Sequence, residues 1–158
     1  MTLTAAALDQ DDGFSFEDLI YRYLRSIHPD WQKTRKRLLA NPNGENVNLR
    51  EAVEGDLENP TLKLRAETQC APGNSNRGIQ CSWTHLKWER STADFQFFGF
   101  PRLGKILVIE TKRLKEELKS FGAKKDTSRD HELLAHWLLE RWGATVILWD
   151  DVVKLQHA

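Results

Sequence analysis

Apolar and polar residues alternate at two different periods along the chain, and these periods predict where helices and strands lie. Between residues 15 and 27 apolar side chains recur at spacings of three and four, which predicts a helix with one buried stripe. Pro29 should end this helix, because the residue before a proline disfavours the helical conformation. Residues 62–67 alternate at a period of two instead, which predicts a strand.

Two short apolar runs further along the chain predict an antiparallel hairpin. Residues 95–98 and 105–109 are separated by a loop that contains glycine and proline, a pattern typical of two strands joined by a turn. If residues 100–104 form the turn, Asp94 faces Glu110 across the pair. We therefore expect these two acids at one end of the hairpin.

The charged residues at this end of the hairpin suggest metal-dependent chemistry. Facing side chains start about 5 Å apart at Cβ, so Asp94 and Glu110 could bind one divalent cation. Alternation along a strand places Glu110 and Lys112 on the same face. Carboxylate oxygens suit Mg²⁺ or Mn²⁺, which lowers the pKa of bound water while an ammonium orients the nucleophile. The pattern predicts hydrolysis of a phosphodiester.

At Ala93-Asp94 and Glu110-Thr111-Lys112 the chain resembles the PD-(D/E)XK nuclease superfamily, with Ala93 in place of the frequent proline. The resemblance implies an α/β fold with a restriction-endonuclease-like core, a mixed β-sheet flanked by helices. It also implies a Mg²⁺- or Mn²⁺-dependent endodeoxyribonuclease. Asp94, Glu110 and the Thr111 carbonyl would hold the metal, and Lys112 would position the attacking water.

The first predicted helix offers a further metal ligand. In this superfamily a glutamate of the first core helix often completes the metal site, and Glu17 is the residue that matches it. Glu17 falls at the rim of the apolar stripe, beside Ile20 and Leu24. The alternative is that Glu17 only complements the positive end of the helix dipole. Glu67, on the alternating strand, is a competing acid.

The order of elements after the hairpin narrows the resemblance. A helix through residues 133–138 that ends near Gly143, followed by a buried strand at 144–149, is similar to the VRR-NUC branch and to phage Holliday-junction resolvases. Many VRR-NUC members carry a glutamine where His131 is the nearest counterpart. This resemblance implies branched or junction DNA as substrate. A site-specific restriction or homing endonuclease and a non-catalytic nucleic-acid-binding module are the alternatives.

The remaining sequence predicts the domain organisation. We expect a flexible N-terminus at residues 1–12 and a single domain at 13–158 with an insertion at about 41–90, of which 45–60 is loop-like. A homodimer or higher homo-oligomer is expected because cutting two strands usually takes two sites related by symmetry.

Basic residues near the proposed site are candidates for phosphate contacts, with a solvated helix surface as the alternative. The predicted nucleic-acid-binding residues are Lys33, Arg35, Lys36, Arg37, Arg113, Lys115, Lys124 and Lys125. The formal net charge of zero argues against a purely electrostatic nucleic-acid binder.

The composition indicates where in the cell the protein acts and whether it has a structural zinc site. The 158 residues contain no apolar stretch that approaches the length of a membrane span, and two cysteines suit a cytoplasmic protein. The spacing of Cys70, Cys81 and His85 lacks the close cysteine pair of a structural zinc site. We therefore expect no membrane contact, and DNA and a hard divalent cation are the partners that the nuclease resemblance implies.

Overall fold

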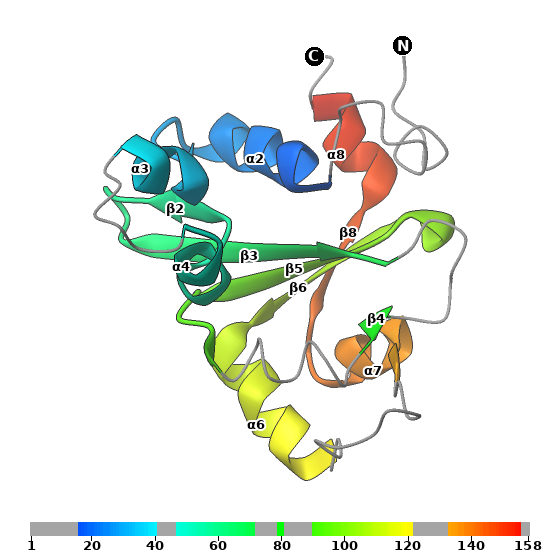
Figure 1. Cartoon of the computed structure of the whole chain (residues 1–158). Helices are drawn as coiled ribbons and strands as arrows, with labels where there is room; N and C mark the ends of the chain where they lie inside the picture. Colours follow the sequence, from blue (N-terminus) through cyan, green and yellow to red (C-terminus); the bar gives the residue numbers. More distant parts are fainter. Residues whose placement is uncertain (1–15, 41–46, 72–78, 81–89, 122–132, 156–158) are drawn as a thin grey trace.

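The computed structural model describes residues 16–40, 47–71, 79–80, 90–121 and 133–155. A six-stranded mixed sheet runs through them in the order β1-β2-β3-β5-β6-β8 (Figure 1). Strands β3 and β5 are parallel, and every other neighbouring pair of this sheet is antiparallel. The strands are β1 (Gln32–Lys33), β2 (Leu57–Asn59), β3 (Leu64–Cys70), β5 (Phe95–Phe100), β6 (Lys105–Glu110) and β8 (Thr145–Leu148).

Helices cover both faces of the sheet (Figure 1). Helices α2 (Phe16–Ile27) and α8 (Trp149–Leu155) lie on one face, and α6 (Thr111–Phe121) and α7 (His136–Arg141) lie on the other. Two short helices, α3 (Thr34–Ala40) and α4 (Val47–Glu54), accompany β1 and β2. A separate pair, β4 (Ile79–Gln80) and β7 (Leu133–Leu134), forms a two-stranded sheet.

Each face of the sheet buries its own core because side chains alternate along the strands. Phe97 of β5 and Ile106 of β6 pack with Leu19 and Ile20 of α2. Their strand neighbours Phe98, Phe100 and Leu107 pack instead with Leu114 and Leu118 of α6, and all five are fully or nearly fully buried. The helices on the two faces are thus fixed by alternate residues of one hairpin.

Gly99 allows α2 to lie close against the sheet. A Cβ atom at this position would come within 2.7 Å of Cε1 of Phe16, the first residue of α2. Phe16 also stacks on Trp149 of α8, with ring centroids 5.6 Å apart. The start of α2 is therefore clamped between β5 and α8.

Several predictions from the sequence are confirmed. The chain is an α/β protein whose mixed sheet is flanked by helices. The first predicted helix is α2, the alternating segment becomes β3, and the predicted hairpin is β5 and β6. None of the helices in the described ranges has the length and apolar character needed to cross a bilayer.

Other predictions are wrong. The loop-like segment expected at 45–60 within an insertion includes α4 and β2, and β2 joins the main sheet. The strand expected to be buried at 144–149 is the edge strand β8, with Val146 42% and Leu148 55% exposed. Apolar β-branched sequence alone does not distinguish an edge strand from a central one. The N-terminal residues 1–12 lie outside the described part of the chain.

Candidate metal centre

The hairpin has a register different from the predicted one. Glu110 pairs with Phe95, and the backbone amide of Thr111 donates to the carbonyl of Asp94 at 2.9 Å. The shift by one residue arises because the turn is shorter than expected: a 3₁₀ turn at Pro101–Leu103 and a left-handed Gly104 let Phe100 pair with Lys105. Since neighbouring residues of a strand face opposite ways, Asp94 and Glu110 belong to opposite faces of the sheet.

The two predicted metal ligands, Asp94 and Glu110, line different hollows in the surface. Asp94 lines a hollow of about 530 Å³ beside β2 and β3, where its Oδ2 accepts a hydrogen bond of 2.8 Å from the Arg65 amide. Glu110 lines a hollow of about 320 Å³ with Arg113 and Thr145. The expectation that these carboxylates face each other around one cation is therefore wrong.

Thr111 and Lys112, the other two residues of the sequence motif, also differ from their predicted positions. Strand β6 ends at Glu110, so Thr111 and Lys112 begin α6 instead of continuing the alternation of the strand. Thr111 is buried, and its Oγ1 accepts a hydrogen bond of 2.9 Å from Nε2 of Gln96. Lys112 is exposed in the first turn of the helix. The shared face expected for Glu110 and Lys112 does not form.

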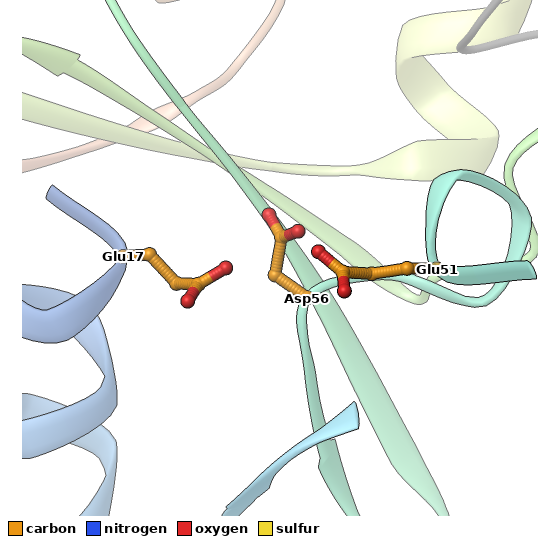
Figure 2. A group of neighbouring side chains, drawn as sticks. All are labelled: Glu17, Glu51 and Asp56. Carbon is orange, nitrogen blue, oxygen red and sulfur yellow. The ribbon is translucent and has the colours of Figure 1, made fainter. Parts of the chain in front are cut away.

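A different group of acids converges on the α2 face of the sheet (Figure 2). Carboxylate oxygens of Glu17, Glu51 and Asp56 all lie within 4.8 Å of one another. Figure 2 shows Asp56 between the other two, with the three side chains turned toward a common space. Glu17 comes from the first turn of α2, Glu51 from α4, and Asp56 immediately precedes β2. We call these three residues the carboxylate cluster.

Local structure fixes the central acid of the cluster. Oδ2 of Asp56 accepts hydrogen bonds from the amide of Thr68 at 2.9 Å and from its hydroxyl at 2.8 Å. Gly55 turns the chain between α4 and Asp56 with a φ of 101°, and a Cβ there would lie 2.9 Å from the carbonyl oxygen of Ala66. Only glycine suits this turn, because the left-handed conformation and the close approach both exclude a side chain.

Two basic side chains approach the cluster from β1 and α3. Nζ of Lys33 lies 3.6 Å from Oε2 of Glu17 and also contacts Asp18. The Arg35 guanidinium lies 3.6 Å from Oε2 of Glu51. Both residues were predicted to contact phosphates, and that role stays a prediction.

The surroundings of the cluster favour the binding of protons or cations by its carboxylates. Burial, with the negative charges of Asp56, Glu51 and Asp18, raises the pKa of Glu17 to about 7, against the opposing effect of Lys33. Burial and Asp56 likewise raise the pKa of Glu51, opposed by Arg35. Like charges at this distance disfavour full ionisation unless a cation compensates them. Oxygen ligands of this kind suit Mg²⁺, Mn²⁺ or Ca²⁺.

Three of the other six predicted phosphate contacts have structural partners. Arg37 pairs with Glu54 at 2.7 Å and Glu58 at 2.8 Å. Lys115 donates to the Ser91 carbonyl at 2.7 Å, and Arg113 pairs with Glu117 of its own helix at 2.7 Å. Lys36 is exposed, while Lys124 and Lys125 lie outside the described residues, as do Cys81, His85 and His131. Glu67, the competing acid, is 1% exposed and pairs in register with Gln96.

Sequence reasoning found one member of the cluster and missed two. Glu17 was assigned to a metal site, but Glu51 and Asp56 fell in the segment interpreted as a loop. A usable signal existed, because Gly55 follows a stretch with helical spacing and is a typical residue just past a helix end. An acid directly before a strand, next to such a glycine, would then have been a candidate.

No protein family model matches the chain, and neither does any curated protein or solved structure. The carboxylate cluster and its basic neighbours are therefore the features of the molecule that bear on its function.

Proposed function

We propose that the protein is a divalent-metal-dependent DNA endonuclease whose metal is held by Glu17, Glu51 and Asp56. The observation that carries the proposal is the convergence of three carboxylates from separate elements to within 4.8 Å. An arrangement of this kind is electrostatically costly without a cation, as the raised pKa of Glu17 indicates. Mg²⁺ or Mn²⁺ is the proposed ion.

The neighbouring residues supply the other parts that phosphodiester hydrolysis needs. A divalent ion bound here would lower the pKa of a water ligand and neutralise charge on the phosphate. Lys33, 3.6 Å from Glu17, is placed to orient that water or the phosphate, the role that the resemblance gave to Lys112. Arg35 beside Glu51 is placed to contact a phosphate oxygen.

The fold is compatible with the superfamily resemblance. A mixed sheet with helices on both faces is what a restriction-endonuclease-like core requires. We assign to Glu17, on the first described helix, the metal role that the resemblance implies. The proposed metal set differs from the sequence motif, because Asp56 and Glu51 replace Asp94 and Glu110. Branched or junction DNA remains the proposed substrate, with a homo-oligomer supplying paired sites.

Cleavage assays with substitutions at both candidate sites test the proposal. Wild-type protein is incubated with Mg²⁺ or Mn²⁺ and a panel of junction, flap, single-stranded and duplex DNAs, with EDTA as the blank. Glu17→Gln and Asp56→Asn should reduce cleavage at least about a hundredfold, since each removes a charged metal ligand. Glu110→Gln and Lys112→Ala are the matched comparison and should leave cleavage within about twofold.

The outcomes separate the alternatives. Loss of cleavage on Glu110→Gln or Lys112→Ala, with activity retained in Glu17→Gln, would return the active site to the sequence motif. Wild-type protein that binds DNA and metal but cleaves no member of the panel would be a non-catalytic module. Cleavage of one defined duplex sequence, and not of junctions, would instead identify a site-specific endonuclease.

A further inference from the structure

The hollow of about 530 Å³ at the β2–β3 end of the sheet is not part of the carboxylate cluster. Its volume is within the range of small-molecule sites, which is about 300–1,000 Å³. Its floor is fixed by polar contacts: Glu58 accepts from Nε2 of Gln32 at 2.7 Å and from Nε of Arg37 at 2.8 Å. Oδ1 of Asn59 accepts from the amide of Leu62 at 2.9 Å. These groups are satisfied and form a rigid base.

The rim of the hollow carries charges that are open to a ligand. Lys63 is exposed, and within the described residues its ammonium has no hydrogen-bond or ion-pair partner. In the described part of the chain the Arg65 guanidinium contacts Glu54 at 3.6 Å and the Thr92 hydroxyl at 3.3 Å. Both cations line the hollow, two residues apart, at the start of β3. Two cations side by side are suited to one phosphate group.

The same rim provides one fixed hydrogen-bond acceptor. Oδ2 of Asp94 is held by the Arg65 amide at 2.8 Å, which orients an exposed carboxylate over the hollow. A carboxylate accepts hydrogen bonds from amino or hydroxyl groups and would repel a bare phosphate. The rim therefore suits a ligand that has both an anionic group and a neutral donor, and a nucleotide has both.

Backbone strain at Lys63 is a second indication that the rim has a function. Among the described residues Lys63 is the one non-glycine residue with positive φ, at 56°. Glycine or asparagine adopts this conformation more easily. The conformation belongs to the turn between β2 and β3, and a lysine in a place that glycine would occupy with less strain points to a use for its charge.

The hollow lies next to the proposed metal centre along the chain. Asp56 of the cluster and Glu58 of the hollow are two residues apart, which limits their Cα separation to about 7 Å. Arg35 likewise pairs with Glu51 of the cluster, whereas Arg37 pairs with Glu58 of the hollow. We propose that the hollow binds one nucleotide of a nucleic-acid strand, with its phosphate against Lys63 and Arg65 and a donor of its base or sugar against Asp94. Only the choice of a nucleic-acid strand rests on the proposed function.

Binding measured without metal tests this site separately from catalysis. The anisotropy of a labelled single-stranded oligonucleotide is followed in EDTA for the wild type, Lys63→Gly, Arg65→Gln and the exposed control Lys154→Ala. Lys63→Gly should keep the melting temperature, because glycine accepts the positive φ, and should weaken binding about threefold to tenfold. It should also lower the slope of log K against log salt by about 0.7. Lys154→Ala should change neither quantity.

The outcomes distinguish this proposal from the proposed function. If Lys63→Gly and Arg65→Gln bind as tightly as Lys154→Ala, the hollow is not a nucleotide site, whatever the protein cleaves. If these two variants bind the oligonucleotide weakly while the wild-type protein cleaves no DNA, the nucleotide site is supported and the proposed nuclease function fails. A nucleoside monophosphate should compete with the oligonucleotide at lower concentration than inorganic phosphate does. Equal competition by phosphate would indicate a general anion site and would overturn the proposal.

Discussion

Nζ of Lys33 on β1 lies 3.6 Å from Oε2 of Glu17 on α2. The two residues come from neighbouring elements in the chain, yet the contact places an ammonium directly beside the carboxylate cluster. Each affects the other, because Lys33 lowers the pKa of Glu17 that burial and nearby acids raise. The pair links metal binding to the proposed positioning of the nucleophile.

Lys33→Met should separate these two roles. The substitution keeps the aliphatic stem and removes the ammonium, so cleavage should fall about a hundredfold or more if Lys33 orients the water or phosphate. Mg²⁺ affinity at pH 8.5 should not fall, because an ammonium is not a metal ligand and repels cations. The pH midpoint of Mg²⁺ binding should move upward, since Glu17 loses the charge that lowers its pKa.

Lys36→Met is the matched control for this substitution. Lys36 is exposed on α3, close to Lys33 in sequence. It should leave both the cleavage rate and the pH midpoint unchanged. A loss of Mg²⁺ affinity at high pH in Lys33→Met would contradict the separation, since it would indicate that Lys33 only supports the shape of the site.

The stability of the metal-free protein should decrease as pH rises from about 4.5 to 7. The pKa of Glu17 is raised from 4.5 to about 7 in the folded state, so folding is favoured while Glu17 is protonated and this contribution is lost as Glu17 ionises. Because the side chain is 31% exposed, we expect only about 1–2 kcal/mol in the free energy of unfolding. Urea denaturation in EDTA at pH 5 and pH 8 measures the difference, and Glu17→Gln should reduce it.

Mg²⁺ should reverse the pH dependence of the stability, so that the protein becomes more stable at high pH. The ion needs ionised carboxylates, so at pH 8 a concentration of about 100 times Kd should add about 2.7 kcal/mol to the free energy of unfolding. The gain should be much smaller at pH 5, where protons compete with the metal. A gain that is equal at both pH values, or that persists in Asp56→Asn, would show that the ion binds elsewhere.

Gly99→Ala should weaken metal binding from a distance. The new Cβ would lie 2.7 Å from the ring of Phe16, which is held by Trp149 and precedes Glu17 in the chain. Overpacking of this kind costs about 1–3 kcal/mol, and relieving it would displace the start of α2. Calorimetric titration with Mn²⁺ should detect the loss of affinity.

Gly104→Ala serves as the comparison for Gly99→Ala. Gly104 has a φ of 63°, and a Cβ added there would meet no atom within 4 Å, so the cost is conformational, about 1 kcal/mol. The substitution should lower the melting temperature without changing Mn²⁺ affinity. Equal metal affinities in the two variants would mean that the seating of α2 does not set the position of Glu17.

Arg37→Leu should destabilise the fold rather than weaken phosphate binding alone. Burial raises the pKa of Glu58, but hydrogen bonds from Arg37 and Gln32 outweigh burial and lower it. Glu58 is 8% exposed at its side chain, so losing Arg37 should cost about 1–3 kcal/mol near neutral pH. The loss should shrink as pH falls and Glu58 is protonated. Thermal unfolding from pH 4 to pH 7 measures this, and a melting temperature equal to that of the wild type would favour a role in DNA contact.

Individual helices and strands could be predicted from the sequence more reliably than the contacts between them. Helical spacing located α2 and period-two alternation located β3, because each pattern reflects burial on one face. The register of β5 and β6 was missed by one residue because it depends on the conformation of Pro101–Leu103 and Gly104. A one-residue error moves an acid to the other face, and the predicted pairing of Asp94 with Glu110 failed for this reason.

The cluster could not be derived from spacing along the chain. Glu17, Glu51 and Asp56 are brought together by the packing of α2 against β3 and of α4 against α3, which joins residues far apart in the chain. The place of Glu17 at the rim of the helix could be predicted because it is a local property, and its role as a metal ligand stays a prediction. Its partners depended on recognising α4, whose apolar spacing is weak over eight residues.

Strand β3 gives a backbone amide to each of the two sites. The amide of Arg65 holds Asp94 at the hollow, and the amide of Thr68 holds Asp56 in the cluster. Deleting one residue between them would turn one of these amides away from its acid, whereas lengthening the Pro60–Lys63 turn would leave both in place. Engineering of this chain should therefore treat 65–68 as an indivisible spacer and keep the length of the turn that precedes it as well, because Lys63 of that turn lines the hollow.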